Sequence, residues 1–307
     1  MTRLVRSLAA LVALCLVAGY GGRVFAPLDS LALLRVPLAV CLGAMALAVP
    51  GVARIGAIAL VVVAVWPWAA GRIAPGEAGS DLRLYQKNLW FLNAEAAAVA
   101  EDILASDADV VTLQELATAN EAVLDLLRDA YPHQQRCSLE GAEGETAVLS
   151  RLPVSGEGWC INGGVIAAFE VLTAGGPVNV VSMHLGWPWP ITPQVKMARF
   201  YAAEVADYEA PVVIGGDFNT VAWSFVVHHI AEAVEGRALG PHRATLRIDP
   251  MTFLAGEARP RGVREGDESR LGIPLPIDQV IAPGGRVSRR PRVGSDHNGL
   301  LADITIF

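Results

Sequence analysis

The sequence has little positive charge and few cysteines. Its 24 lysines and arginines are outnumbered by 31 aspartates and glutamates, which gives a formal net charge of −7. This balance argues against a broad electrostatic grip on nucleic acid, although it leaves room for a local basic patch. The four cysteines form no cluster with histidine of the kind that binds zinc. Cys15 and Cys41 are expected to be packing residues, whereas Cys137 and Cys160 either form a disulfide or stay two separate buried thiols.

Hydrophobic residues make up 53% of the chain, more than is usual for a soluble domain. Three nearly uncharged apolar runs account for the excess, at residues 4–20, 31–49 and 55–70. Each is close to the length needed to cross a bilayer. Arg35 lies near enough to the end of its run to reach the interface, and Trp66 and Trp68 fit an interfacial aromatic belt. No polar residues of the kind that line a transport pathway occur in these runs, which excludes a transporter.

A cleavable signal peptide is the alternative interpretation of the first run, because Arg3 and Arg6 precede it. Two further runs follow it and no small-x-small cleavage site is evident, so three retained membrane helices are favoured. With Arg54 on the same side as Arg3 and Arg6, the positive-inside rule places the N-terminus in the cytoplasm. We therefore expect a membrane anchor over 1–72 that contacts the bilayer through residues 4–70, a linker over 73–81 and a domain over 82–307 outside an inner or plasma membrane.

The soluble part alternates strand-like and helix-like segments. Strands are expected at 82–90, 109–113, 131–137, 146–150, 165–172, 178–183, 211–214, 277–281 and 299–307, and helices at 95–104, 120–130, 192–208 and 221–233. The segment 237–272 has no assignable pattern.

The stretch over residues 211–219 is the first sign of a functional site. The buried strand 211–214 ends in two glycines followed by Asp217, Phe218 and Asn219. Strand alternation predicts that Phe218 points into the core while Asp217 and Asn219 reach the same small volume. There the carboxylate could take a proton from water and the amide could donate to an oxyanion. An Asx-turn or a helix cap is the structural alternative.

Other strands end in the same way. Asn88, Glu115 and His184 each close a separate expected strand, and a glutamate after a β-branched strand is costly to bury unless it is paired or metal-bound. Near the C-terminus, Asp278 lies within a strand, and Asp296 and His297 precede the last one. Polar groups gathered at one edge of a sheet are how a scaffold assembles a site.

Three further residues are candidate substrate contacts. Trp187 and Trp189 would form an aromatic rim after His184, which contacts a ligand or the bilayer surface or simply packs in its loop. Arg199 would lie near the mouth of the site, although such an arginine is more often solvated.

Five pieces in order carry a resemblance to the endonuclease/exonuclease/phosphatase superfamily, the metal-dependent hydrolases related to DNase I. They are Asn88 at a strand end, Gln114-Glu115, His184, the run 216–219, and Asp278 followed by Ser295-Asp296-His297. The resemblance covers residues 82–307, and the apolar N-terminus is similar to a membrane-anchored bacterial subgroup. It implies an α/β fold, a four-layer sandwich in which two mainly antiparallel sheets pack face to face with helices outside.

The resemblance also implies roles for these residues. Glu115 would bind a divalent cation with Asn88 and Asp296, and their oxygen ligands suit Mg²⁺ or Mn²⁺. Asp217 would orient or deprotonate the attacking water and Asn219 would donate to the phosphoryl oxygens. His184 and His297 would stabilise charge on the phosphate.

In that scheme Asp278 would hold His297, and the protein would be a membrane-anchored phosphoesterase acting by in-line attack of water. Its substrate would be either nucleic acid or a lipid or headgroup phosphate. No protein partner can be deduced. The alternative is a catalytically silent phospholigand-binding or interaction module. Such a module is expected to have lost Glu115, Asp217, Asp296 or His297, and all four are present.

Overall fold

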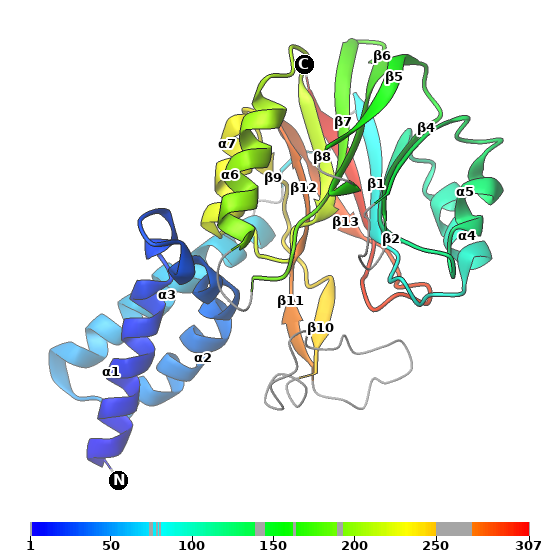
Figure 1. Cartoon of the computed structure of the whole chain (residues 1–307). Coiled ribbons are helices and arrows are strands. Elements are labelled where there is room, and N and C mark those ends of the chain that lie inside the picture. Colours follow the sequence, from blue (N-terminus) through cyan, green and yellow to red (C-terminus); the bar gives the residue numbers. More distant parts are fainter. Residues whose placement is uncertain are drawn as a thin grey trace.

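Two six-stranded β-sheets pack face to face in the computed structural model of the chain (Figure 1). The structure describes residues 2–73, 76–77, 79, 81–138, 145–161, 164–188, 193–249 and 272–306. The first sheet has the order β13(Gly284–Arg289), β14(Leu300–Thr305), β1(Leu82–Asn88), β2(Val110–Leu116), β4(Glu145–Ser150) and β3(His133–Cys137). The second has the order β5(Val154–Ile161), β6(Ile166–Thr173), β7(Gly176–His184), β8(Val212–Asp217), β12(Asp278–Ala282) and β9(Arg237–Ala238).

Each sheet contains one parallel pair, β1–β2 in the first and β7–β8 in the second, and its other described pairs are antiparallel. Side chains such as Leu84, Val110, Val180 and Val213 fill the space between the sheets. These β-branched and leucine side chains alternate along their strands, which directs one set inward on each sheet.

Helices cover both outer faces. α4(Ala96–Ser106) and α5(Ala122–Leu127) pack on the first sheet, and α6(Pro193–Ala206) and α7(Phe225–Ala233) pack on the second (Figure 1). The expected four-layer α/β sandwich with mainly antiparallel sheets is therefore confirmed.

The strand assignments are incomplete in the less hydrophobic segments. β5 and β13 were not expected. β10(Leu246–Ile248), within the segment 237–272 that has no assignable pattern, pairs with β11(Ile273–Leu275) just beyond it. No residue of β5 is fully buried, so its sequence carries little of the periodicity that burial imposes. The expected helix at 120–130 is shorter, because only Ala122–Leu127 is helical.

The N-terminal runs form α1(Thr2–Ala18), α2(Arg35–Ala46) and α3(Gly51–Ile73), with two 3-10 segments, η1(Gly21–Arg23) and η2(Ala26–Leu34), between α1 and α2. Two segments are long and apolar enough to cross a membrane, Ala26–Ala46 and Gly51–Ile73. The 17-residue α1 is not one of them. Arg35, expected to reach the interface, is buried and donates to the carbonyl of Gly19.

The expected linker contacts the domain where the structure describes it. The amides of Gly79 and Asp81 donate to the carbonyls of Asp303 and Ile304 on β14. The division of the chain at residues 72 and 81 stays a prediction.

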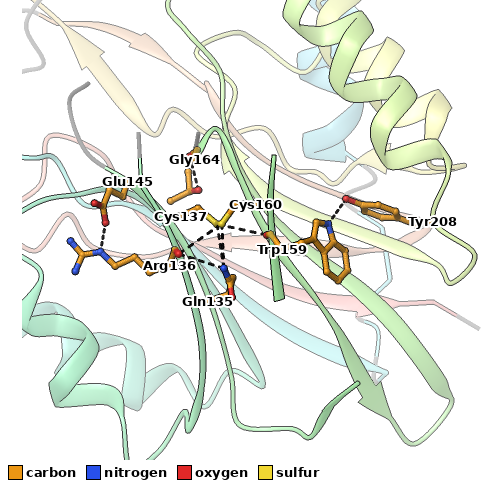
Figure 2. The surroundings of a disulfide bond; sticks show 9 residues. Gln135, Arg136, Cys137, Glu145, Trp159, Cys160, Gly164 and Tyr208 are labelled. Carbon is orange, nitrogen blue, oxygen red and sulfur yellow. Dashed lines mark hydrogen bonds and ion pairs between the residues drawn. A yellow bond between two sulfur atoms is a disulfide. The ribbon is translucent and has the colours of Figure 1, made fainter. Parts of the chain in front are cut away.

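Cys137 and Cys160 form a disulfide that joins β3 of the first sheet to β5 of the second (Figure 2). Around it, Gln135 donates to the Cys160 sulfur, and the Trp159 indole donates to the Tyr208 hydroxyl. The structure therefore has a disulfide between these cysteines and not two separate buried thiols.

Candidate active site

Strand register brings the polar strand ends together. In the second sheet His184 on β7 is paired with Asp217 on β8, which is paired in turn with Asp278 on β12. In the first sheet Asn88 on β1 is paired with Gln114 on β2. Because parallel strands end at the same sheet edge, both parallel pairs deliver their last residues to one place. The facing sheets then close these two rows around a single volume.

Two of these residues have unusual backbone conformations. Glu115 has φ 56° and Asn219 has φ 50°, a region that side chains other than glycine rarely adopt. Glu115 was expected just after a strand, but it lies inside β2, where the register with β4 shifts between Leu113 and Leu116. A bulge of this kind re-aims a side chain, and here it directs the carboxylate toward Asn88.

The Asn88 amide joins the two sheets. Its nitrogen Nδ2 lies 2.9 Å from Glu115 Oε1 and 2.9 Å from Asp217 Oδ2, so it donates to both carboxylates. Its oxygen Oδ1 accepts from the Trp90 amide at 2.8 Å. In this orientation Asn88 positions the two acids, and a role as a metal ligand through Oδ1 would require the amide to rotate.

His297 is held between two acids. Its Nδ1 lies 2.8 Å from Asp278 Oδ2, and its Nε2 lies 3.9 Å from Asp217 Oδ2. The Ser295 hydroxyl accepts from the His297 amide and donates to the Asn88 carbonyl, which fixes the loop against β1. Burial opposes the charge on the ring, but Asp278 and Asp217 outweigh it and hold the pKa of His297 well above its usual value.

The pKa values of the two paired acids are shifted in opposite directions. Burial, reinforced by the negative charge of Asp278, raises the pKa of Asp217 to about 8. Burial acts in the same direction on Asp278, but His297 outweighs it and lowers the pKa of that carboxyl. Asp278 with His297 is thus an ion pair, while Asp217 binds a proton more readily than an ordinary aspartate does.

His184 completes the cluster from the other side. Its Nε2 is 3.8 Å from Asp217 Oδ2 and 3.9 Å from Glu115 Oε1. Burial lowers its pKa more than Glu115 raises it, so the ring is neutral at pH 7. The Asn219 amide nitrogen lies 3.5 Å from this Nε2 and donates to the Leu185 carbonyl.

The cluster fits a divalent cation. Ligand atoms of Glu115, His184 and Asp217 lie within 4.8 Å of one another, as do those of Asp217, Asp278 and His297. Asp296 Oδ1 is also buried at this edge and accepts no hydrogen bond within the described part of the chain, although it lies 3.9 Å from His297 Nε2. A buried carboxylate oxygen without a hydrogen-bond donor is stabilised by a nearby cation, here the His297 ring or a bound metal ion. The expected metal residues Glu115 and Asp296 are therefore chemically suited to that role.

Of the three candidate substrate contacts, Trp187 and Arg199 pack against apolar or aromatic side chains outside the acidic cluster. Arg199 is exposed on α6, and its guanidinium lies 5.8 Å from the centre of the Phe225 ring. Trp187 is partly buried against an apolar cluster that includes Trp223. Among the described residues, neither has a hydrogen bond or ion pair with the acidic cluster, and Trp189 lies outside them.

Several supporting residues were not expected from the sequence. Gln86 donates to Asp278 Oδ1 at 3.0 Å and to Gln114, which donates in turn to Ser182. The buried Lys87 donates to the carbonyls of Arg292 and His297, at 2.5 Å and 3.2 Å. For Gln86 and Lys87, only their position next to Asn88 on the same strand could have indicated this role, whereas Gln114 was already part of the resemblance.

Comparisons with known proteins agree on the fold. SmcL is 15% identical, with a TM-score of 0.54 over 73% of this chain and 98% of its own. A variant of beta toxin from Staphylococcus aureus with bound magnesium ions is 14% identical, with a TM-score of 0.53 over 74% and 100%. Truncated TDP2 from Caenorhabditis elegans is 19% identical, with a TM-score of 0.51 over 72% and 96%.

The comparison with curated proteins finds no match. The model of the Endonuclease/Exonuclease/phosphatase family, however, matches residues 86–297, from Gln86 on β1 to His297 beside Asp278. The matched range therefore includes both rows of paired residues, Asn88 and Gln114 in the first sheet and His184, Asp217 and Asp278 in the second. The chain belongs to the Endonuclease/Exonuclease/phosphatase family.

Proposed function

We propose that the chain is a membrane-anchored, divalent-metal-dependent hydrolase of phosphate esters that acts by in-line attack of water. The observation that carries the proposal is the environment of Asp217 Oδ2, which accepts from Asn88 and lies 3.8 Å and 3.9 Å from the rings of His184 and His297. One acid thus faces three groups able to orient water or balance the charge of a phosphate. The substrate is a phosphodiester or phosphomonoester of nucleic acid or of a lipid or its headgroup.

Glu115 and Asp296 would hold the cation, with Asn88 joining them if its amide rotates. Mg²⁺ suits these oxygen ligands and Mn²⁺ could replace it. The magnesium in the beta toxin structure supports this assignment. Bound there, the cation supplies positive charge that neutralises the phosphate and lowers the cost of forming the leaving oxyanion.

The remaining groups act on the proton and the phosphate. Asp217, once deprotonated, takes the proton of the attacking water, and the Asn219 amide donates to a phosphoryl oxygen. His297, kept positive by Asp278, stabilises the negative charge that develops on the phosphate, and the neutral His184 donates a hydrogen bond to it.

We further propose that the N-terminal helices lie in the bilayer with the catalytic domain on the outer face. Large apolar side chains are exposed along α1 and α3, including Leu4, Leu11, Ile55, Val62 and Trp66. Such a surface is unstable in water and suited to lipid. The disulfide between Cys137 and Cys160 supports an oxidising compartment for the domain.

The test is hydrolysis by the full chain in phospholipid nanodiscs, with Mg²⁺ or with EDTA. Plasmid DNA, bis-p-nitrophenyl phosphate, sphingomyelin and phosphoinositides form the substrate panel. We expect turnover that EDTA, Asp217→Asn and His297→Gln each abolish, while the exposed Asp125→Asn leaves it unchanged. Folded protein that turns over none of these substrates, or that works equally well in EDTA, would contradict the proposal.

A further inference from the structure

A residue of the N-terminal segment caps a helix of the catalytic domain. Asp29 in η2 accepts hydrogen bonds from the amides of Phe225 and Val226, at 2.6 Å and 3.2 Å, across 196 and 197 positions of sequence. Ser224 accepts from the next amide, that of Val227. The first three N–H groups of α7 are therefore satisfied, and among the described residues the first two have Asp29 as their partner.

The contact is closely fitted. Gly22 packs directly against Asp29, and a Cβ atom added at Gly22 would lie 2.6 Å from Asp29 Oδ1. The Ser30 hydroxyl donates to the Pro188 carbonyl at 3.1 Å. The Trp223 indole donates to the Ala32 carbonyl at 3.0 Å. Figure 1 shows the blue N-terminal helices attached beside α6 and α7.

Apolar packing completes the interface. Ala32 and Leu33 belong to one buried cluster with Val221, Ala222 and Trp223. A cluster of this kind excludes water from the hydrogen bonds beside it, which makes them stronger and more costly to lose. Residues 29–33 are thus packed against the domain, although they lie within an apolar segment long enough to cross a membrane.

The segments held by these contacts follow shortly after the active-site residues His184 and Asn219 in the sequence. Phe225 follows Asn219 by six positions, and Pro188 follows His184 by four. We propose that Asp29 is a positioning residue, through which the N-terminal segment holds the loops that follow His184 and Asp217, the second of which carries Asn219, in their active geometry. The effect on turnover rests on the proposed function, whereas the effect on the loops does not.

The test uses the full chain in nanodiscs and the soluble substrate bis-p-nitrophenyl phosphate, which needs no access to the bilayer. Asp29→Ala should lower kcat about tenfold and leave KM nearly unchanged, because small displacements of catalytic groups cost rate. Asp29→Asn should have an intermediate kcat, because one of the two acceptor oxygens becomes an NH2 group that cannot accept a hydrogen bond from a helix amide. Asp125→Ala, on an exposed aspartate of α5, is the matched control.

Hydrogen exchange at Phe225 and Val226 gives a readout independent of turnover. Asp29→Ala should speed exchange at both amides about tenfold. Asp29→Asn should speed it at one of them, the amide that faces the new NH2 group. Gly22→Ala should act like Asp29→Ala without touching the catalytic domain, and it keeps the test decisive if Asp29→Ala fails to fold. Gly56→Ala on α3 is its control, because an added Cβ there meets nothing within 4 Å.

Wild-type exchange at these amides in both Asp29→Ala and Gly22→Ala would overturn the proposal. So would wild-type exchange at both amides in Asp29→Asn, because replacing one acceptor oxygen with a donor would then cost neither hydrogen bond. If the wild type shows no turnover, the proposed function fails, while the exchange measurement still decides whether Asp29 holds these loops.

Discussion

Asp217 and Asp278 are directly paired across β8 and β12, and the ring of His297 contacts both. Two buried carboxylates this close cannot both be charged without a cation between them. The structure resolves the conflict by pairing Asp278 with His297, which leaves Asp217 to gain or lose a proton. Asp278 is the charged partner of His297 because it lies at hydrogen-bond distance from the ring, whereas Asp217 does not.

Replacing Asp278 with asparagine should lower the pKa of His297, because the ring loses its closest negative partner. We expect kcat to fall about a hundredfold, within the range for losing a charged catalytic group. An NMR titration of the His297 ring measures the first effect directly. An unchanged titration would show that Asp217 alone keeps the ring charged.

The Glu115 carboxylate should dominate affinity for the cation. Glu115→Gln should weaken Mg²⁺ binding at least about tenfold, as loss of a charged hard ligand does. Isothermal titration calorimetry on the full chain measures it, and Glu101→Gln on the exposed face of α4 is the matched control. Equal affinity in both variants would place the cation elsewhere in the cluster.

Much of the sheet core and the gathering of polar strand ends followed from the sequence. Runs such as 211–214 are β-branched and buried, so their period and their polar ends are visible locally. The contacts of Lys87 and Asp29 were not visible in this way. Each joins segments about two hundred residues apart, and the partners are backbone groups, which no side-chain pattern marks.

The same limit applies to the candidate substrate contacts. Trp187 was expected in a rim after His184 or packed in its loop, and Arg199 near the mouth of the site or solvated. The structure directs Trp187 into a cluster with Trp223 and Arg199 onto the ring of Phe225. Proximity along the chain did not predict which side of the loop the side chains would take.

The disulfide should contribute to stability and little to turnover. Cys137 and Cys160 close a loop with a sequence separation of 23, for which the chain-entropy account gives about 3 kcal/mol. The double variant Cys137→Ser, Cys160→Ala should therefore unfold at lower denaturant concentration. Its unfolding should also be insensitive to dithiothreitol, whereas reductant should destabilise the wild type by a similar amount. A wild type indifferent to reductant would contradict this expectation.

Acid should weaken the packing of α3 against the domain through His242. This ring makes an edge contact with Trp223, with centroids 6.4 Å apart, and lies close to Gly71 of α3. Burial, together with the nearby His228, lowers the pKa of His242 to about 4. Its unfolded pKa is about 6.5, so the neutral ring stabilises the fold fully above that pH and loses the contribution as pH falls toward 4.

Over that range this group alone should make the free energy of unfolding fall by up to about 1.4 kcal/mol per pH unit. Chemical denaturation of the full chain at pH 7.5 and pH 4.5 measures the total dependence, to which carboxylates also contribute. His242→Phe should remove the part due to this ring, so its stability should fall less on acidification than that of the wild type. His133→Phe, on a histidine of β3 away from α3, should keep the wild-type dependence. Equal slopes for the wild type and His242→Phe would show that the ring takes up its proton without disturbing the interface.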